Sequence, residues 1–154
     1  MMKLTTLIYI EDQDDWLMLH RVKKANDINE NMWVGVGGKF EYGESPLECA
    51  QREVLEETGQ ELLAPVFQGF VTFFYADQEP MLIMVYTGRI GSREFSETNE
   101  GVLAWIPKNQ VLDLDLWEGD QIFIRAIMAD QGPFDLKFYY DDSRQLMKVE
   151  EKML

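Results

Sequence analysis

The chain has 154 residues, of which 46% are hydrophobic and 12% aromatic, and its formal net charge is −14 at pH 7. This length suits one domain that buries roughly two-thirds of its unfolded surface, so we expect residues 1–154 to form a single domain. The apolar content excludes intrinsic disorder. The negative charge argues against binding to nucleic acid or to an anionic membrane surface.

No apolar run approaches the roughly 20 residues that a membrane-spanning helix needs. The N-terminal segment lacks the long apolar region and cleavage site of a signal peptide. The single cysteine, Cys49, cannot form an internal disulfide, which agrees with a reducing compartment. We therefore expect a cytoplasmic protein.

Apolar alternation and turn residues predict a series of strands. In chain order they are 4–10, 16–22, 32–38 (broken by glycines), 62–75, 81–90, 102–106, 134–140 and 146–150. Helices are predicted at 46–58, at 107–112 and from near 120 to about 129. Strands on both sides of a central helix, with another helix late in the chain, predict an α/β fold with a mixed sheet and helices on its faces.

The stretch from Gly38 to Gly59 is strongly acidic. It sets six glutamates against two cations, Lys39 and Arg52. The glutamates are Glu41, Glu44, Glu48, Glu53, Glu56 and Glu57. On a helix Glu53 would be repelled by Glu56 and Glu57, which follow it by three and four positions. Hard cations such as Mg²⁺ offset such repulsion by binding carboxylate oxygens, and they leave positions free for a phosphate. The alternative interpretation is a charged, solvated helix.

The ends of this helix are marked in the sequence. Ser45 begins a capping box with proline in the first turn, and Gly59 favours a helix end. Helical periodicity predicts a core face separate from the acidic arc, with Cys49 on the acidic side. The predicted core residues are Leu47, Ala50, Val54, Leu55 and Thr58.

These residues resemble the signature of the Nudix hydrolase family, which runs from a Gly and a Glu to Arg-Glu-aliphatic-x-Glu-Glu-x-Gly-aliphatic. Here the matching positions are Gly38, Glu44, Arg52, Glu53, Val54, Glu56, Glu57 and Gly59. Gln60 departs from the pattern, because an aliphatic residue usually follows, and Leu62 is expected to supply that packing. The resemblance implies the Nudix α/β/α sandwich, with a central mixed sheet and a loop-helix catalytic motif. It also implies Mg²⁺-assisted hydrolysis of a phosphoanhydride, with Mn²⁺ as a substitute ion.

By position, the resemblance implies that Glu53, Glu57 and the carbonyl of Gly38 bind the metal. Glu56 is implied as a further ligand or as the general base. Such a site lowers the pKa of a bound water and needs a group that takes its proton.

Two further predictions concern residues around these metal ligands. Arg52 and Glu44 are implied to form an ion pair that holds the loop against the helix. Glu100 is a candidate for an additional metal ligand or base, because relatives that act on oxidised purines carry a catalytic glutamate in this loop. Glu97 is the rival for that role, and a solvated surface acid is the plain alternative for Glu100.

The resemblance extends over most of the chain to the MutT-type 8-oxo-dGTP diphosphatases. It implies that Trp117 stacks on a purine and that Asp120 hydrogen-bonds the base edge. The structural alternatives are a core or interface aromatic for Trp117 and a helix N-cap for Asp120. Two positions depart from that branch: Val34 stands where an asparagine reads the oxidised base, and Gly119 stands where some members carry a second acid.

The cations near the signature are candidates for phosphate contacts, with solvated surface cations as the alternative. They are Arg21, Lys23, Lys24 and Lys39. The sole histidine, His20, is given no role, and Cys49 is expected to be a small residue packed under the loop.

Together these features predict a Mg²⁺-dependent enzyme that converts a nucleoside triphosphate to the monophosphate and pyrophosphate. A purine nucleotide, such as 8-oxo-dGTP, is the expected substrate, and cleansing of the nucleotide pool is the expected role. We expect a monomer or a homodimer without a nucleic-acid or membrane partner. The alternatives are hydrolysis of ADP-ribose, a nucleotide sugar or a dinucleotide, and a non-catalytic nucleotide sensor.

Overall fold

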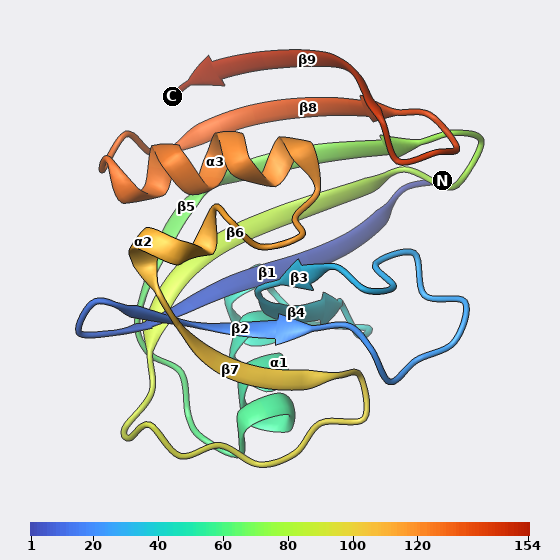
Figure 1. Ribbon diagram of the computed structural model, residues 1–154. Coiled ribbons are helices and arrows are strands. Elements are labelled where there is room, and N and C mark those ends of the chain that lie inside the picture. The colour runs from blue at the N-terminus through green and yellow to red at the C-terminus, as the bar shows by residue number, and fades with distance from the viewer.

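A computed structural model describes all of residues 1–154 and contains nine strands and three helices (Figure 1). The strands are β1 (Lys3–Asp12), β2 (Asp15–His20), β3 (Trp33–Val34), β4 (Val36–Lys39), β5 (Leu63–Tyr75), β6 (Met81–Arg89), β7 (Val102–Pro107), β8 (Phe134–Tyr140) and β9 (Leu146–Met153). The helices are α1 (Pro46–Thr58), α2 (Lys108–Val111) and α3 (Glu118–Met128).

The strands form one mixed sheet in the order β3-β2-β1-β6-β5-β8-β9. The pairs β1–β6 and β5–β8 are parallel, whereas the other pairs are antiparallel. β4 pairs with β1 and β7 pairs with β2, both off the main path. β1 therefore connects the glycine-rich strand β4 to the centre of the sheet.

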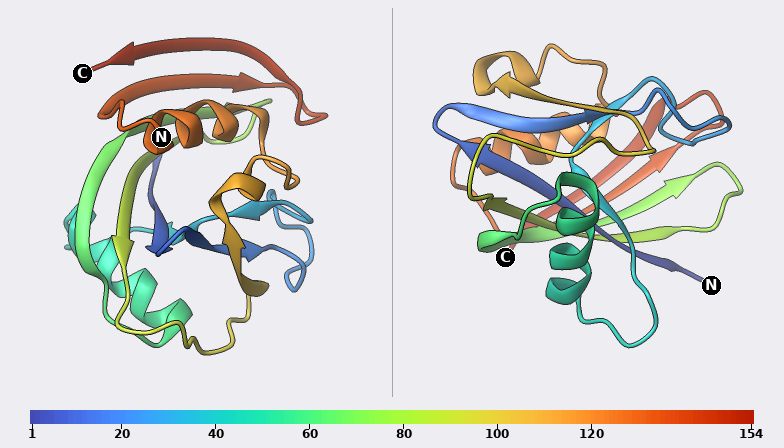
Figure 2. Two further views of the ribbon diagram at one scale, coloured as in Figure 1. Left: turned by 60° about the vertical axis from the view of Figure 1, so that its left-hand side comes forward. Right: turned by 90° about the horizontal axis from the view of Figure 1, so that it is seen from below.

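Each face of the sheet carries its own hydrophobic cluster, because successive strand residues point to opposite sides. In β1, Ile8 and Ile10 belong to a cluster that includes Ala50 and Val54 of α1. Tyr9, between them, belongs to the cluster that includes Phe123 of α3. The views in Figure 2 show α1 and α3 on opposite sides of the curved sheet. The predicted mixed sheet with helices on both faces is confirmed.

Helix α1 has the ends that the sequence predicts. The Ser45 side chain accepts a hydrogen bond from the Glu48 backbone N–H at 3.2 Å, and the Glu48 carboxylate accepts one from the Ser45 N–H at 3.0 Å. Gly59 ends the helix in the left-handed conformation, with φ of 78°. The chain thus enters and leaves the helix at defined residues, which fixes the glutamates between them.

The buried face of α1 differs from the predicted one. Leu47 and Leu55 are 37% and 54% exposed, whereas Cys49 and Glu57 are 0% and 5% exposed. The buried face is rotated relative to the predicted one: Ala50, Val54 and Thr58 are buried as predicted, but Cys49 and Glu57 from the predicted acidic side take the places of Leu47 and Leu55. The interface with the glycine strand determines this rotation, and side-chain hydrophobicity alone does not reveal it.

Helix α3 begins earlier than predicted, with Trp117 as its N-cap residue and Glu118 as its first residue. Asp120 is therefore inside the first turn, where its backbone N–H donates to the Trp117 carbonyl at 3.0 Å. The interpretation of Asp120 as the N-cap is wrong. None of the three helices combines the length and the apolar character needed to cross a lipid bilayer.

The rotation of α1 predicts unequal costs for two neighbouring substitutions. Val54→Ala should lower the free energy of unfolding by about 2 kcal/mol, because it leaves a cavity at a fully buried position. Leu55→Ala should cost less than about 0.5 kcal/mol, because that side chain is mostly in solvent. Urea denaturation of both variants measures the difference. Equal losses would contradict the observed orientation of the helix.

Candidate active site

The glycine strand and helix α1 meet at Glu57. β4 pairs with β1, with Gly37 opposite Leu7 and Gly38 opposite Thr6. This pairing points the Gly37 N–H at α1, where it donates to Glu57 Oε2 at 3.0 Å. The other carboxylate oxygen of Glu57 is buried and has no hydrogen-bond partner.

An isolated carboxylate in such a place is costly to ionise. Burial is the largest effect and raises the pKa of Glu57 to about 9, with further contributions from the nearby Glu100 and Glu53. The Gly37 N–H acts in the opposite direction but only partly offsets them. The protein alone therefore lacks the positive charge that this position requires.

Glu53, one turn earlier on α1, lies against Gly38. A Cβ atom added to Gly38 would lie 2.5 Å from Glu53 Oε1 and 2.8 Å from Oε2. Only glycine allows the strand and this carboxylate to approach so closely. Burial also raises the pKa of Glu53, whereas the hydrogen bond from Arg52 lowers it.

Arg52 collects the remaining acids of the signature. Its Nη1 lies 2.9 Å from Glu53 Oε1 and 3.1 Å from Glu56 Oε2. Its other nitrogens contact both carboxylate oxygens of Glu44 and the Lys39 carbonyl, the latter at 2.9 Å. The predicted Arg52–Glu44 pair is therefore present, and it joins the loop to the helix. Glu56 is the most exposed of these glutamates, with 56% of its side chain in solvent.

No three His, Cys, Asp or Glu side chains converge tightly enough to form a ready-made metal site. Glu53 and Glu56 are instead turned toward Arg52. The donor set nevertheless fits a hard divalent cation, because Glu57 has a buried oxygen without a partner beside the carboxylate of Glu53 and the backbone of Gly38.

Glu100 is the acid from outside the signature that the structure brings to this place. After burial, Glu100 is the next cause that raises the pKa of Glu57, and Glu100 Oε2 lies 3.4 Å from Arg21 Nη1. Glu97 is exposed and takes part in none of the side-chain hydrogen bonds or ion pairs. Of the two rival residues, Glu100 therefore has the geometry of a site residue.

The loop that carries Glu100 is held by Gln60, the one departure from the family signature. The Gln60 side chain donates to Ser92 Oγ at 3.1 Å and to the Glu94 carbonyl, and it accepts from the Ser92 N–H at 3.1 Å. Leu62 is 4% exposed and fills the core beside it. The Gln60 amide thus holds the segment around Ser92 and Glu94 to the end of α1 by hydrogen bonds, where the family usually has an aliphatic side chain.

Trp117 is enclosed rather than open. It is 3% exposed, and its Nε1 donates to Asn29 Oδ1 at 2.8 Å. The rings of Phe73 and Tyr140 pack edge-on against it, at centroid distances of 5.1 and 4.8 Å. The Arg144 guanidinium lies over the indole at 5.5 Å. In this conformation the residue serves as a core aromatic.

Asp120 faces an apolar region that also holds Tyr9. Burial raises the pKa of Asp120 to about 7. The Tyr9 hydroxyl is fully buried without a hydrogen-bond partner, and after burial the charge of Asp120 is the next cause that raises its pKa. The sequence did not indicate Tyr9 as a candidate site residue, because a tyrosine in a strand of alternating apolar residues is typical of an ordinary core position.

The two departures from the oxidised-purine branch have structural reasons. A Cβ at Gly119 would lie 2.6 Å from ring atoms of Phe138 and from the Tyr140 hydroxyl, so no acid fits there. The Gly119 N–H donates to that same hydroxyl at 2.7 Å. Val34 is 7% exposed and packs in the cluster on the α1 side, away from the cluster of Trp117.

The predicted phosphate-binding cations have different environments. Lys23 Nζ donates to the Thr98 carbonyl at 3.1 Å, whereas Lys24 and Lys39 are exposed and make no ion pair. The Arg21 guanidinium contacts Asp27 through Nε and Glu100 through Nη1. Lys39 borders a hollow of about 460 Å³ beside the signature loop.

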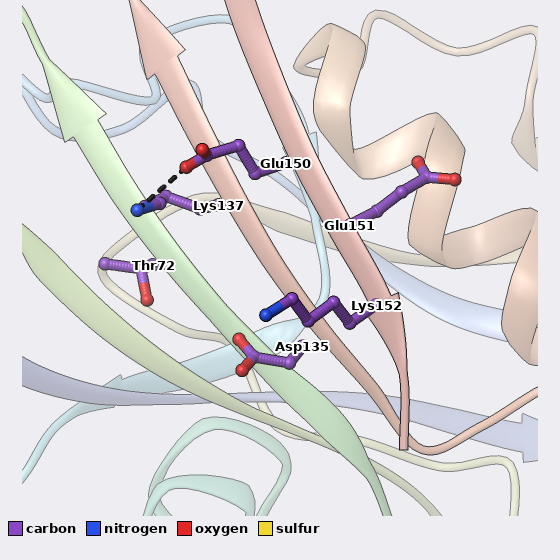
Figure 3. Close-up of a pocket in the computed structure, with 6 residues that line it drawn as sticks. All are labelled: Thr72, Asp135, Lys137, Glu150, Glu151 and Lys152. Carbon is purple, nitrogen blue, oxygen red and sulfur yellow. Dashed lines mark ion pairs between the residues drawn. The ribbon is translucent and has the colours of Figure 1, made fainter.

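Another hollow, of about 380 Å³, lies on the β5-β8-β9 part of the sheet (Figure 3). Its lining residues are Thr72, Asp135, Lys137, Glu150, Glu151 and Lys152. It contains none of the predicted site residues, and two of its charged residues, Lys137 and Glu150, form an ion pair of 2.8 Å. We therefore assign the candidate active site to the α1–β4 junction.

The comparisons with known proteins agree with this site. The NUDIX domain model matches residues 1–127, so the chain belongs to the Nudix family. Nudix hydrolases act on phosphoanhydride bonds and generally use divalent metals. A curated relative is the uncharacterized Nudix hydrolase YvcI of Bacillus subtilis (strain 168), which is 29% identical over 143 residues, covering 90% of this chain and 87% of the relative.

Further relatives are MutT-like. The oxidized purine nucleoside triphosphate hydrolase of Mus musculus is 26% identical over 125 residues, covering 80% of each chain. The solved MutT protein from Bacillus halodurans superposes with a TM-score of 0.85 at 25% identity, covering 97% of each chain. The MutT protein from Methanosarcina mazei Go1 gives a TM-score of 0.73 at 22% identity, covering 86% of this chain and 96% of that one. The expected Nudix fold is confirmed.

The raised pKa of Asp120 predicts a pH-dependent contribution to stability. Between its unfolded pKa of 3.8 and its folded pKa of about 7, the folded state holds a proton that the unfolded state has released. The free energy of unfolding should therefore fall as pH rises through this window, by a total of about 2 kcal/mol for this partly exposed residue.

Urea denaturation of the wild type and of Asp120→Asn at pH 5 and pH 8 measures this effect. The wild type should lose more stability than the variant between the two pH values, because the amide does not titrate. An identical loss in both proteins would show that Asp120 keeps an ordinary pKa.

Proposed function

We propose that the protein is a Mg²⁺-dependent nucleotide pyrophosphohydrolase that converts a purine nucleoside triphosphate and water to the monophosphate and pyrophosphate. The observation that carries the proposal is the buried carboxylate of Glu57, with one unpartnered oxygen, placed between Glu53, Gly38 and Glu100. A fold without a use for this arrangement would be more stable with an apolar residue at position 57.

In this proposal Glu53, Glu57 and the Gly38 carbonyl hold the divalent ion, with Glu56 or Glu100 as a further ligand. The bound ion would neutralise charge on the phosphates and acidify a water molecule. Whichever of Glu56 and Glu100 is not a ligand is available to take the proton.

Arg52 has a structural role in this proposal, because it contacts residues of both the helix and the loop. Its ties to Glu44 and to the Lys39 carbonyl fix the loop, while its contacts to Glu53 and Glu56 keep these carboxylates from repelling each other. A bound ion would give Glu53, and Glu56 if it is the further ligand, a positive partner besides Arg52. Lys23 and Lys39 remain as the cations proposed to contact the phosphates, because neither of them forms an ion pair within the protein.

The proposal of a purine substrate rests on the region around Asp120. Asp120 and the Tyr9 hydroxyl provide polar groups in an otherwise apolar surround, and Trp117 forms part of the wall beside them. The relative from Mus musculus is named for hydrolysis of oxidized purine nucleoside triphosphates, which supports 8-oxo-dGTP as a candidate and nucleotide-pool cleansing as the role.

Selectivity for the oxidised base is expected to be modest. Gly119 offers no side chain and Val34 offers no hydrogen-bonding group, and one missing partner in a buried pocket costs about 1 to 3 kcal/mol. These same two positions favour a second candidate, a Nudix hydrolase of another nucleoside diphosphate derivative such as ADP-ribose, a nucleotide sugar or a dinucleotide.

We also propose that residues 1–154 act as one unit in the cytoplasm, as a monomer or a homodimer. The strands β8 and β9 lie beyond the matched residues 1–127, but β8 pairs with β5 in the same sheet. Tyr140, at the end of β8, contacts both Gly119 and Trp117.

A substrate panel tests the proposed function. The purified protein is incubated with Mg²⁺ and with dGTP, dATP, 8-oxo-dGTP, ADP-ribose, a nucleotide sugar and a dinucleotide, and the products are separated by chromatography. We expect monophosphate and pyrophosphate from the purine triphosphates. Glu57→Gln should lower kcat about 100-fold or more, whereas the exposed Glu61→Gln serves as a matched control with unchanged activity. Turnover of no triphosphate, or full activity of Glu57→Gln, would contradict the proposal.

A further inference from the structure

Arg21 lies where three strands meet. It follows β2, whose last residue, His20, pairs with Trp33 of β3 on one side and with Val102 of β7 on the other. The Arg21 N–H donates to the Met32 carbonyl at 3.0 Å, and the Arg21 carbonyl accepts from the Asn31 N–H at 2.8 Å. β2 and β7 are antiparallel, so the residue after the end of β2 (Arg21) and the residues before the start of β7 (including Glu100) lie at the same end of the two strands. The backbone of Arg21 is therefore fixed before its side chain makes any contact.

The Arg21 guanidinium uses two nitrogens on two different acids. Nε lies 2.7 Å from Asp27 Oδ2, and Nη1 lies 3.4 Å from Glu100 Oε2. The side chains of Arg21 and Asp27 are only 12% and 6% exposed. Asp27 is itself fixed, because its Oδ1 accepts the Asn29 N–H at 3.2 Å. Buried ion pairs of this kind are weak evidence for stability, because an apolar pair of similar volume is often as stable.

The buried Arg21–Asp27 pair also contacts Glu100, through Arg21 Nη1. Glu100 would otherwise be free to turn into solvent, away from the like charge of Glu57, because 35% of its side chain is exposed. Its position in an irregular loop provides no regular secondary structure to hold it. The Arg21 guanidinium contacts Glu100 Oε2 and so restrains a carboxylate whose charge acts on Glu57.

We propose that Arg21 is a positioning residue, which Asp27 anchors and which holds the Glu100 carboxylate toward Glu57 in the candidate active site. The inference rests on the proposed function, in which Glu100 is a metal ligand or the general base. Arg21 itself touches neither substrate nor metal. Its guanidinium, and not merely its charge, is required, because a lysine presents one compact ammonium and cannot span two acids with separate nitrogens.

The loop that contains Asp27 also reaches the other end of the site. Asn29, two residues further on, accepts the indole N–H of Trp117 at 2.8 Å. The residues between β2 and β3 therefore contact both Glu100, through Arg21, and the wall of the proposed purine region. A displaced loop would move both groups, so the test must separate the effect on Glu100 from a general loss of structure.

The test is a double-mutant cycle between Arg21→Lys and Glu100→Gln. Arg21→Lys alone should lower kcat about tenfold or more, with KM for the triphosphate within about twofold, because positioning of the reacting groups is lost while binding remains. In the Glu100→Gln background, the same substitution should change kcat by less than about twofold. Arg93→Lys is the matched control: Arg93 also contacts two acids, Asp12 and Asp15, from the same loop, and its variant should keep wild-type kcat.

The same four proteins, free of metal and nucleotide, provide a readout without activity. The loss of Tm caused by Arg21→Lys should be smaller in the Glu100→Gln background than in the wild type, because the contact that it weakens is already altered. Inactivity of the wild type would refute the proposed function, but the Tm cycle would still report on the contact. Wild-type kcat in Arg21→Lys, or equal losses of kcat in both backgrounds, would overturn the positioning role and leave the proposed function intact.

Discussion

The structure depends on one carboxylate that the fold buries without a full complement of partners. Glu57 lies on the buried face of α1, in its last turn, where an aliphatic residue would ordinarily pack, and only the Gly37 N–H compensates it directly. Burial of an unpaired charge costs several kcal/mol. The pairing of β4 with β1 and the capped helix keep this carboxylate in place, and the close approach at Gly38 brings the carboxylate of Glu53 beside the same strand. Such a cost is typical of a site that is completed by a ligand.

Around Glu57 the protein organises its excess of negative charge with a few arginines, each of which contacts several acids. Arg52 joins the loop to the helix through Glu44 and the Lys39 carbonyl. Arg21 does the same between Asp27 and Glu100, and Gln60 clamps the loop that carries Glu100 from the end of α1. With a net charge of −14, a polyanionic substrate can approach only if the local sign is reversed at the site, which a bound divalent cation does.

The sequence predicts the α/β class, the signature and the helix ends, because these depend on local patterns: a capping box, a terminal glycine and fixed spacings. It does not predict the rotation of α1, since Leu47 and Leu55 are more hydrophobic than Cys49 and Glu57, which face the sheet. Nor does it reveal Tyr9 or Arg21, whose roles arise from contacts between distant segments. Gly119 shows the same limit: the absence of an acid there follows from Tyr140, about twenty residues further on, which fills the space.

The central claim is that Glu57 remains incomplete until a divalent cation binds, and thermal unfolding in the absence of any nucleotide tests it most directly. Saturating Mg²⁺ or Mn²⁺ should raise the Tm of the wild type by about 5 °C or more, because the ion binds only the folded state. Glu57→Gln should have a higher Tm than the wild type without metal, because an amide avoids the cost that the raised pKa of the Glu57 carboxyl group imposes on folding. The variant should also lose most of the metal-induced increase in Tm. An equal increase in both proteins would contradict the account.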